Sequence, residues 1–317
     1  MMHDDALTDV LDLMRVRGAV MAHVRANAPW GLRLPRATGA TFHAVTAGVC
    51  WVRVSGRAPR ELQRGDAVLL PTGAAHVIAS HATGSAREWD RVAKAQARSS
   101  TGEIVLSGSG RSTHLICAAY DYDRHIVHPL LSLLPPILVV SGEASDARST
   151  LQLLHHELTA PSAGSAIIVD RLIDVLFGHV VRAWVAGQHD RGRSWLLALR
   201  NPTVARALAV LHADPGADWS IDRLARESSV SRATLTRHFT ALVGEPPLAY
   251  LTRWRMELAA RQLRETNDAV SAIAHRVGYT SEFAFSRAFS RLRGRPPGRY
   301  RVEVRRKDHQ ANQPSRS

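Results

Sequence analysis

VSRATLTRHFTALVGEPPLAYL, residues 230 to 251, and TSEFAFSRAFSRLRGRPPGRYR, residues 280 to 301, follow one pattern at a constant offset of 50 residues. The identical pairs are Ser231/Ser281, Arg237/Arg287, Phe239/Phe289, Leu242/Leu292, Gly244/Gly294, Pro246/Pro296, Pro247/Pro297 and Tyr250/Tyr300. Identities in one register, including paired prolines and glycines, are not expected by chance. The two stretches therefore predict a structural unit that occurs twice.

Each copy predicts a helix-turn-helix. Helical residues around 221–227 and 270–276 precede the two copies, and Ser231 and Ser281 are placed to cap the second helix of each. One long helix, from about residue 248 to 265, joins the copies. A helix-turn-helix places its second helix in the major groove of DNA. A protein-binding repeat array is the alternative, but two copies are too few for a solenoid, which needs about three or more.

The second helix of each copy has an apolar and a polar face. Residues four apart share one face, so Leu235 with Phe239 and Phe285 with Phe289 are expected to face inward. The opposite faces carry residues that hydrogen-bond base edges in the major groove. These candidate DNA-contacting residues are Arg232, Thr234, Thr236, Arg237 and Thr240 in the first copy, and Glu282, Ser286, Arg287 and Ser290 in the second.

Three stretches of the second copy carry a family resemblance: AHRVGYTS at 274–281, FSRAF at 285–289 and GRPPGRYR at 294–301. They resemble the signature of AraC-type transcription regulators, over roughly residues 201 to 301. The resemblance implies that both motifs read successive major-groove segments on one face of DNA. It places the base-contacting positions on Ala233, Thr236, Arg237, Phe283, Ser286 and Arg287. Ala233 and Phe283 depart from long polar readers and would contact thymine methyl groups instead of donating hydrogen bonds.

The charge distribution also favours DNA as the partner. The chain has 317 residues and a formal net charge of +13. The segment from Ser220 to the end has 18 arginines, one lysine and nine acidic residues, a net charge of +10. Residues 1–219 carry the remaining +3. Arginine forks onto phosphate oxygens or onto guanine N7 and O6, so this basic third suits nucleic acid. A coating protein that binds nucleic acid without sequence preference is an alternative and predicts phosphate contacts alone.

The N-terminal part reads as a small β-barrel or sandwich. Residues 41–78 alternate short apolar stretches with Gly and Pro, and strand-like residues resume at 114–120. The run GDAVLLPTGAAH at 65–76 matches the second cupin motif, and the whole part resembles the cupin sensor domain of one branch of AraC-type regulators. The expected fold is thus multidomain: an all-β cupin-like barrel with trailing helices, then an all-α double helix-turn-helix.

Four side chains on predicted barrel strands are candidates for an effector pocket: His43, Cys50, His76 and Cys117. Imidazole and thiolate are acceptable zinc or copper ligands, but the chain lacks the His-x-His and nearby acid of metal-bearing cupins. We therefore expect no metal, no cofactor and no catalytic residues. A cupin-type metal-dependent enzyme is the alternative. His155 and His156 are interpreted as surface residues of a helix.

The helix over 167–185 is apolar around more than one packing face. One side is expected to cover the barrel and the other, with Leu172 and Leu176, to contact a second subunit. The polar stretch at 187–193 is the expected linker between a sensing and dimerisation domain, 1–190, and a DNA-binding domain, 195–305.

The sequence as a whole predicts a sequence-specific DNA-binding transcription regulator. Its signal is expected to be a small ligand in the barrel or an oxidant or metal acting at Cys50 and Cys117, the only two cysteines. The expected partners are double-stranded DNA, a second copy of the chain and, as a candidate, RNA polymerase. Acidic residues occupy the place of a basic secretory n-region, and no apolar run reaches about 18 residues, so a cytoplasmic, non-membrane protein is expected.

Overall fold

The computed structural model describes residues 6, 8–10, 16–96, 103–121, 134–142, 145–187 and 198–311. They form two compact units. Of the described residues, one unit contains 16–96, 103–121, 134–142 and 145–187, and the other contains 198–311 together with 6 and 8–10. The expected linker lies, from residue 188 onward, outside the described residues.

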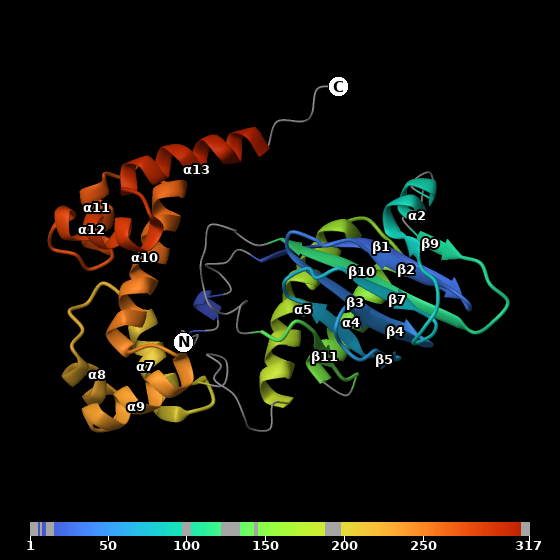
Figure 1. Cartoon of the computed structure of the whole chain (residues 1–317), viewed down its shortest axis with the longest axis horizontal. Helices are drawn as coiled ribbons and strands as arrows, with labels where there is room; N and C mark the ends of the chain where they lie inside the picture. The colour runs from blue at the N-terminus through green and yellow to red at the C-terminus, as the bar shows by residue number, and fades with distance from the viewer. Residues whose placement is uncertain are drawn as a thin grey trace. The chain divides into compact units, whose positions relative to one another are not determined.

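The N-terminal unit is a sandwich of two sheets, which confirms the predicted β-rich cupin-like fold (Figure 1). The six-stranded sheet has the order β11-β6-β3-β10-β1-β9 and the five-stranded sheet the order β5-β4-β7-β2-β8. The strands are β1 Arg17–Asn27, β2 Gly31–Leu34, β3 Ala40–Ala47, β4 Val49–Val54, β5 Arg60–Gln63, β6 Ala67–Leu70, β7 His76–Ala79, β8 Arg87–Glu88, β9 Glu103–Leu106, β10 Ser112–Asp121 and β11 Leu138–Val140. A short helix, α2 (Trp89–Gln96), lies between β8 and β9.

The central strands of the six-stranded sheet, β3, β6 and β10, are buried on both faces. On β10, Leu115 and Cys117 belong to the apolar core between the sheets, and side chains alternate along a strand. The opposite face packs against the helices α4 (Ser145–Thr159) and α5 (Ser165–Gly187). There the Tyr120 hydroxyl donates to the Ile173 carbonyl over 3.0 Å. Two-sided burial explains why β3 and β10 read as nearly continuous apolar runs.

The α5 helix presents a different face to solvent than the sequence suggested. Leu176 is fully buried in the unit, together with its neighbours Ile173 and Phe177, so it does not lie on a free surface. Ile168 and Val175 are exposed, and Leu172 between them is half-buried. The expectation that Leu176 faces a second subunit is therefore wrong, because the helix is rotated so that this side chain packs on the sheet.

The C-terminal unit is helical, as predicted. Its helices are α7 Pro202–Ala213, α8 Ile221–Glu227, α9 Arg232–Val243, α10 Pro247–Glu265, α11 Val270–Arg276, α12 Glu282–Arg293 and α13 Pro297–Ala311. Figure 1 shows α10 running from the α8/α9 pair to the α11/α12 pair. Asn201 caps α7 by accepting from the Val204 amide over 3.1 Å, with proline at the first helical position. None of the helices in the described ranges is both long enough and apolar enough to cross a bilayer.

The described N-terminal residues, 6 and 8–10, belong to this helical unit. The Asp9 carboxylate lies 3.1 Å from His212 Nδ1, and Val10 is fully buried. His212 also contacts the Tyr250 hydroxyl over 2.6 Å and stacks on the Trp254 ring. These contacts join residues about 200 positions apart in the chain.

Candidate nucleic-acid interface

The turns of the two helix-turn-helix motifs begin alike, although the second turn is one residue longer. In each, a residue with left-handed backbone follows the first helix: Ser229 at φ 55° in the first motif and Gly278 at φ 84° in the second. Glycine adopts this conformation without steric cost. A Cβ on Gly278 would also lie 2.5 Å from the Gly216 carbonyl oxygen, which belongs to the turn before α8. The close approach at Gly278 packs the two motifs against each other.

Serine caps fix the start of both second helices, as predicted. Ser231 Oγ accepts from the Thr234 amide over 3.2 Å, and Ser281 Oγ accepts from the Ala284 amide over 3.4 Å. Each helix ends at a left-handed glycine, Gly244 or Gly294. Repeated caps at equal positions give α9 and α12 the same length.

The predicted DNA-contacting residues lie on the outer faces of α9 and α12, opposite the buried Leu235, Phe239, Phe285 and Phe289. Thr234, Thr240, Ser286 and Ser290 are half-buried, and Thr240 Oγ1 is shielded from solvent with no hydrogen-bond partner among the described residues. The exposed members are Arg232, Ala233, Thr236, Arg237, Glu282, Phe283 and Arg287.

The exposed arginines differ in how they are held. Arg232 forms an ion pair with Asp222 of α8, with 2.8 Å between Nε and Oδ1. Within the described ranges, Arg237 and Arg287 have no carboxylate partner. The Arg287 guanidinium lies 5.7 Å from the ring centre of Phe283, which is 71% exposed. Arg237 and Arg287 are thus available to an external acceptor, whereas Arg232 is anchored.

The repeat extends to two structural arginines at the same offset of 50 residues. Arg255 donates to the carbonyls of Pro215 and Ala217 over 2.6 and 2.7 Å, before α8. Arg305 donates to the Thr266 carbonyl and, over 2.7 Å, to Asn267 Oδ1, in the loop before α11. Each arginine therefore fixes the loop that leads into the first helix of its motif.

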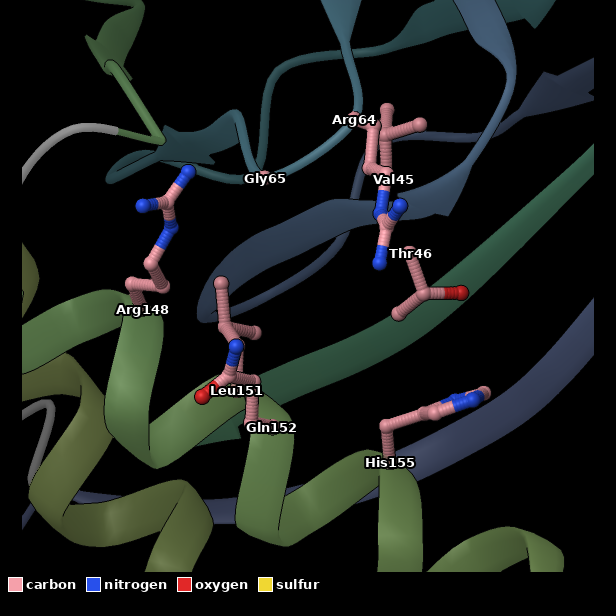
Figure 2. A pocket seen from close by; sticks show the side chains of 8 residues that line it. All are labelled: Val45, Thr46, Arg64, Gly65, Arg148, Leu151, Gln152 and His155. Atoms are coloured by element: carbon pink, nitrogen blue, oxygen red, sulfur yellow. The ribbon is translucent and has the colours of Figure 1, made fainter.

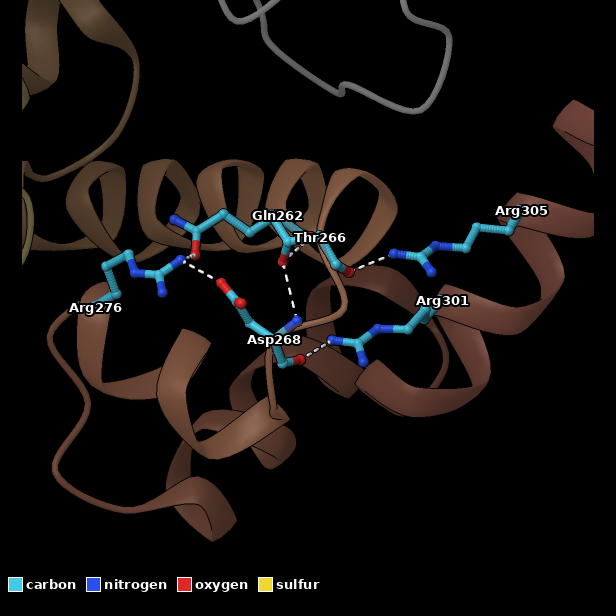
Figure 3. Close-up of polar contacts among 6 residues, drawn as sticks. All are labelled: Gln262, Thr266, Asp268, Arg276, Arg301 and Arg305. Carbon is cyan, nitrogen blue, oxygen red and sulfur yellow. Dashed lines mark hydrogen bonds and ion pairs between the residues drawn. The ribbon is translucent and has the colours of Figure 1, made fainter.

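A polar network completes the second motif between α10, α11 and α13 (Figure 3). Arg276 donates to Asp268 Oδ2 over 2.9 Å and to Gln262 Oε1 over 2.7 Å. The hydrogen bond from Arg276 lowers the pKa of the Asp268 carboxyl. Figure 3 shows the members of the network, which are Gln262, Thr266, Asp268, Arg276, Arg301 and Arg305.

The second residue of each Gly-x-Pro-Pro segment forms an ion pair, and the charges of the two pairs are exchanged between the motifs. Glu245 pairs with Arg253 in the first motif, and Arg295 pairs with Glu303 at the equivalent positions of the second. A further pair, Arg293 with Glu257, joins α12 to α10 and is almost fully buried, with side chains 8% and 3% exposed. Sequence patterning did not predict these pairs, since isolated charges on helices are usually solvated.

The candidate effector-pocket residues lie in the interior of the N-terminal unit. His43 Nδ1 is 3.1 Å from Cys117 Sγ, and His43 Nε2 is 2.8 Å from His76 Nε2. His76 Nδ1 lies 2.7 Å from the Ala74 carbonyl, which only accepts, so His76 donates there and accepts at Nε2. His43 then donates from Nε2 and accepts the Cys117 thiol proton at Nδ1. With all three side chains neutral, this one arrangement of protons satisfies every hydrogen bond from Cys117 through His43 and His76 to the Ala74 carbonyl.

The two thiols are buried in the apolar core. Cys50 and Cys117 are 0% and 1% exposed, and both belong to the apolar core between the sheets. Burial raises the pKa of Cys50 to about 12 and also raises the pKa of Cys117. Among the side chains that the structure describes, no group of three or more His, Cys, Asp or Glu residues is arranged to hold a metal ion.

The buried histidines predict acid sensitivity of the N-terminal unit. Burial lowers the pKa of His43 and of His76 below the usual 6.5, so the unfolded chain binds protons that the folded unit does not. The contribution of the two imidazoles to the free energy of unfolding is therefore fully present above pH 6.5. This free energy should fall by about 1.4 kcal/mol per pH unit for each imidazole as the pH drops below 6.5. Chemical unfolding between pH 8 and pH 5 checks this, with a flatter profile expected for a His43→Gln, His76→Gln variant. A variant of exposed His156 should keep the native profile.

Comparisons with known proteins match both units. A cupin family model matches residues 5–186, and a helix-turn-helix domain model matches residues 224–303. A protein of Streptomyces lividans named "Putative AraC-like transcription regulator" is 38% identical over 301 residues, 94% of this chain and 98% of that protein. The HTH-type transcriptional regulator AlkR of Acinetobacter baylyi is 29% identical over 305 residues, 94% of this chain and 99% of that protein.

Among solved structures, the DNA-binding domain of AdpA in complex with a target DNA is 30% identical, covers 33% of this chain and 95% of that chain, and has a TM-score of 0.32. The two family matches follow each other along the chain without overlap. With its N-terminal cupin domain and C-terminal helix-turn-helix domain, the chain belongs to the AraC-like family of transcription regulators.

Proposed function

We propose that α9 and α12 enter successive segments of the major groove and read a specific DNA sequence. The observation that carries this proposal is the equal placement of Arg237 and Arg287, both exposed and both without a carboxylate partner among the described residues. An arginine with free donors binds guanine O6 and N7 bidentately. The hydrogen bonds of Arg255 and Arg305 to backbone carbonyls hold the two motifs in place. In the proposed complex this allows α9 and α12 to contact one duplex.

The remaining exposed residues suit different base features. Phe283 and Ala233 offer apolar contact to thymine methyl groups, and Glu282 accepts from the cytosine amino group. A cation–π contact between Arg287 and Phe283 favours one placement of the guanidinium before DNA arrives. We therefore expect α12 to read a thymine beside a guanine, while Arg232, held by Asp222, serves the backbone.

Competition binding tests sequence specificity. A duplex is first selected from a random library by the full-length protein, and it then competes against its own scrambled version at fixed salt. Specific reading predicts that roughly a thousandfold more scrambled duplex is needed for equal displacement. Equal displacement by both duplexes would instead identify a coating protein that contacts phosphates alone.

For the signal, we propose a small ligand of the N-terminal unit in preference to thiol oxidation. A reactive thiol needs an exposed, electropositive setting that favours thiolate, whereas Cys50 and Cys117 are buried and protonated. Mild oxidant should therefore leave binding of the selected duplex unchanged, in native protein and in a Cys50→Ser, Cys117→Ser variant alike. A loss of binding that is confined to the native protein would establish a thiol switch.

We propose a homodimer that forms through the exposed stripe of α5, defined by Ile168, Leu172 and Val175. These positions recur at four and three residues along the helix and share one face. Asp at Ile168 and Val175 is expected to convert a dimer to a monomer in light scattering, because charge in an apolar interface is costly. Asp at exposed Val302 of α13 is the control and should leave the mass unchanged. A native protein that is already monomeric at micromolar concentration would contradict the proposal.

A further inference from the structure

A cavity of about 380 Å³ lies in the N-terminal unit, and its lining does not include the hydrogen-bonded residues His43, His76 and Cys117. Val45 and Thr46 of β3 form one wall, and Arg64 and Gly65 of the loop between β5 and β6 form another. The third wall is one face of α4, since its members are spaced by three and four residues: Arg148, Leu151, Gln152 and His155. Figure 2 shows Arg64 reaching down from the loop and Arg148 rising from α4 on the other side.

Every ionisable side chain that lines this cavity is a base: Arg64, Arg148 and His155. No carboxylate lines it, and neither arginine has an ion pair with a described acidic residue. The nearby Asp66 accepts from the amides of Gln63 and Gly142, each over 2.9 Å. Two cations that share an opening without a counter-charge repel each other, and an anion between them removes that cost.

His155 is not the simple surface residue that the sequence suggested. It is half-buried, its Nδ1 is shielded from solvent, and this atom has no hydrogen-bond partner among the described residues. Its ring lies 5.7 Å from the ring of His23, whose Nε2 is likewise shielded and unpartnered. Burial, followed by the positive charges of neighbouring groups, lowers the pKa of His155. Shielded polar atoms without partners are rare and call for an acceptor or donor that completes them.

We propose that this cavity binds a small organic anion, a carboxylate or a phosphate ester with an apolar group, as the effector of the N-terminal unit. The inference rests on the proposed function for the role of that unit as sensor. Arg64 and Arg148 would hold the anionic group, the Gln152 amide would donate to it, and Val45 and Leu151 would contact the apolar part. The volume lies within the range of about 300 to 1,000 Å³ that is typical of ligand sites.

An anion in this position connects the sheet to the helices. Arg64 belongs to the loop before β6, and Arg148 belongs to α4. On its other side α4 packs on α5, where Thr150 Oγ1 lies 2.9 Å from His179 Nδ1. Occupancy would thus fix the position of α4 and, through α5, the exposed stripe proposed for dimerisation.

Isothermal titration calorimetry of the full-length protein with three probes tests the proposal. Benzoate and phenyl phosphate carry the two anionic groups, and benzamide has the shape of benzoate without its charge. Saturable binding of at least one anion and none of benzamide is expected, and the anion that binds distinguishes a carboxylate from a phosphate effector. Arg64→Gln and Arg148→Gln should each weaken that binding roughly 10- to 100-fold. Arg111→Gln, at an exposed arginine away from the cavity, should not change it.

Three results would each overturn the proposal. Neither anion binds at millimolar concentration, benzamide binds as well as the anions, or a folded Arg64→Gln, Arg148→Gln variant binds the anion as well as the native protein. Thermal unfolding of each variant shows whether it is folded, and His155→Gln offers a second probe of the same wall. The titration needs no DNA, whereas the competition assay needs no anion. Failure of the anion site therefore leaves the DNA-reading function standing, and the reverse also holds.

Discussion

Alanine at Arg237 or at Arg287 is expected to weaken binding of the selected duplex by about 1 to 3 kcal/mol each, or roughly 5- to 150-fold. Both side chains are exposed on equivalent outer faces without a carboxylate partner among the described residues. A base-reading arginine loses its bidentate hydrogen bonds to guanine, while binding to random DNA depends on phosphate contacts and changes less. Gel-shift titrations at fixed salt, on selected and random duplexes, measure both effects.

Arg206→Ala is the matched control, because Arg206 is an exposed arginine of α7 that pairs with Glu227 and lies outside α9 and α12. It removes the same charge and should leave the specificity ratio unchanged. The two motifs occupy separate groove segments, so the losses at Arg237 and Arg287 should be nearly additive in the double variant. Equal losses on selected and random DNA would show that these arginines contact only phosphates.

Glu257→Ala is expected to destabilise the helical unit by about 3 to 5 kcal/mol. The Glu257 side chain is 3% exposed, and its removal leaves the guanidinium of Arg293, 8% exposed, buried without this carboxylate. That guanidinium also lies over the Tyr300 ring at 5.9 Å, so it cannot move out without disturbing the packing of α13. Urea unfolding followed by helical circular dichroism measures the loss.

Glu227→Ala provides the comparison for this prediction, since Glu227 forms an ion pair with Arg206 in which the side chains are 43% and 60% exposed. An exposed pair contributes about 1 kcal/mol or less because water screens it. Similar losses for Glu227→Ala and Glu257→Ala would show that burial of the Arg293 pair carries no special cost. A loss confined to Glu257→Ala supports a role of this pair in holding α12 on α10.

Most of the DNA-binding architecture was predictable from the sequence because its signals are local. The serine caps and the Gly-x-Pro-Pro segments lie within one or two helical turns of the helix ends that they specify. Both signals occur twice, at the offset of 50 residues. The predicted helix near 248–265 agrees with α10. The clamps of Arg255 and Arg305 were missed, although both lie at the same offset of 50, because a backbone carbonyl partner leaves no residue pattern.

By itself, the sequence determined the order of the two domains, the duplicated motif and the residues that form its outer faces, since these follow from helical period, capping and turn residues. The tertiary structure alone decided that Leu176 is buried while Val175 is exposed, that both thiols lie in the core, and that Glu257 pairs with Arg293. It also brought Arg64 to the face of α4 that carries Arg148 and His155. The physical reason is that burial and pairing depend on which face of a helix docks against a distant strand or helix. Packing between the two segments sets that docking angle, and no periodic pattern in the sequence encodes which distant segments will meet.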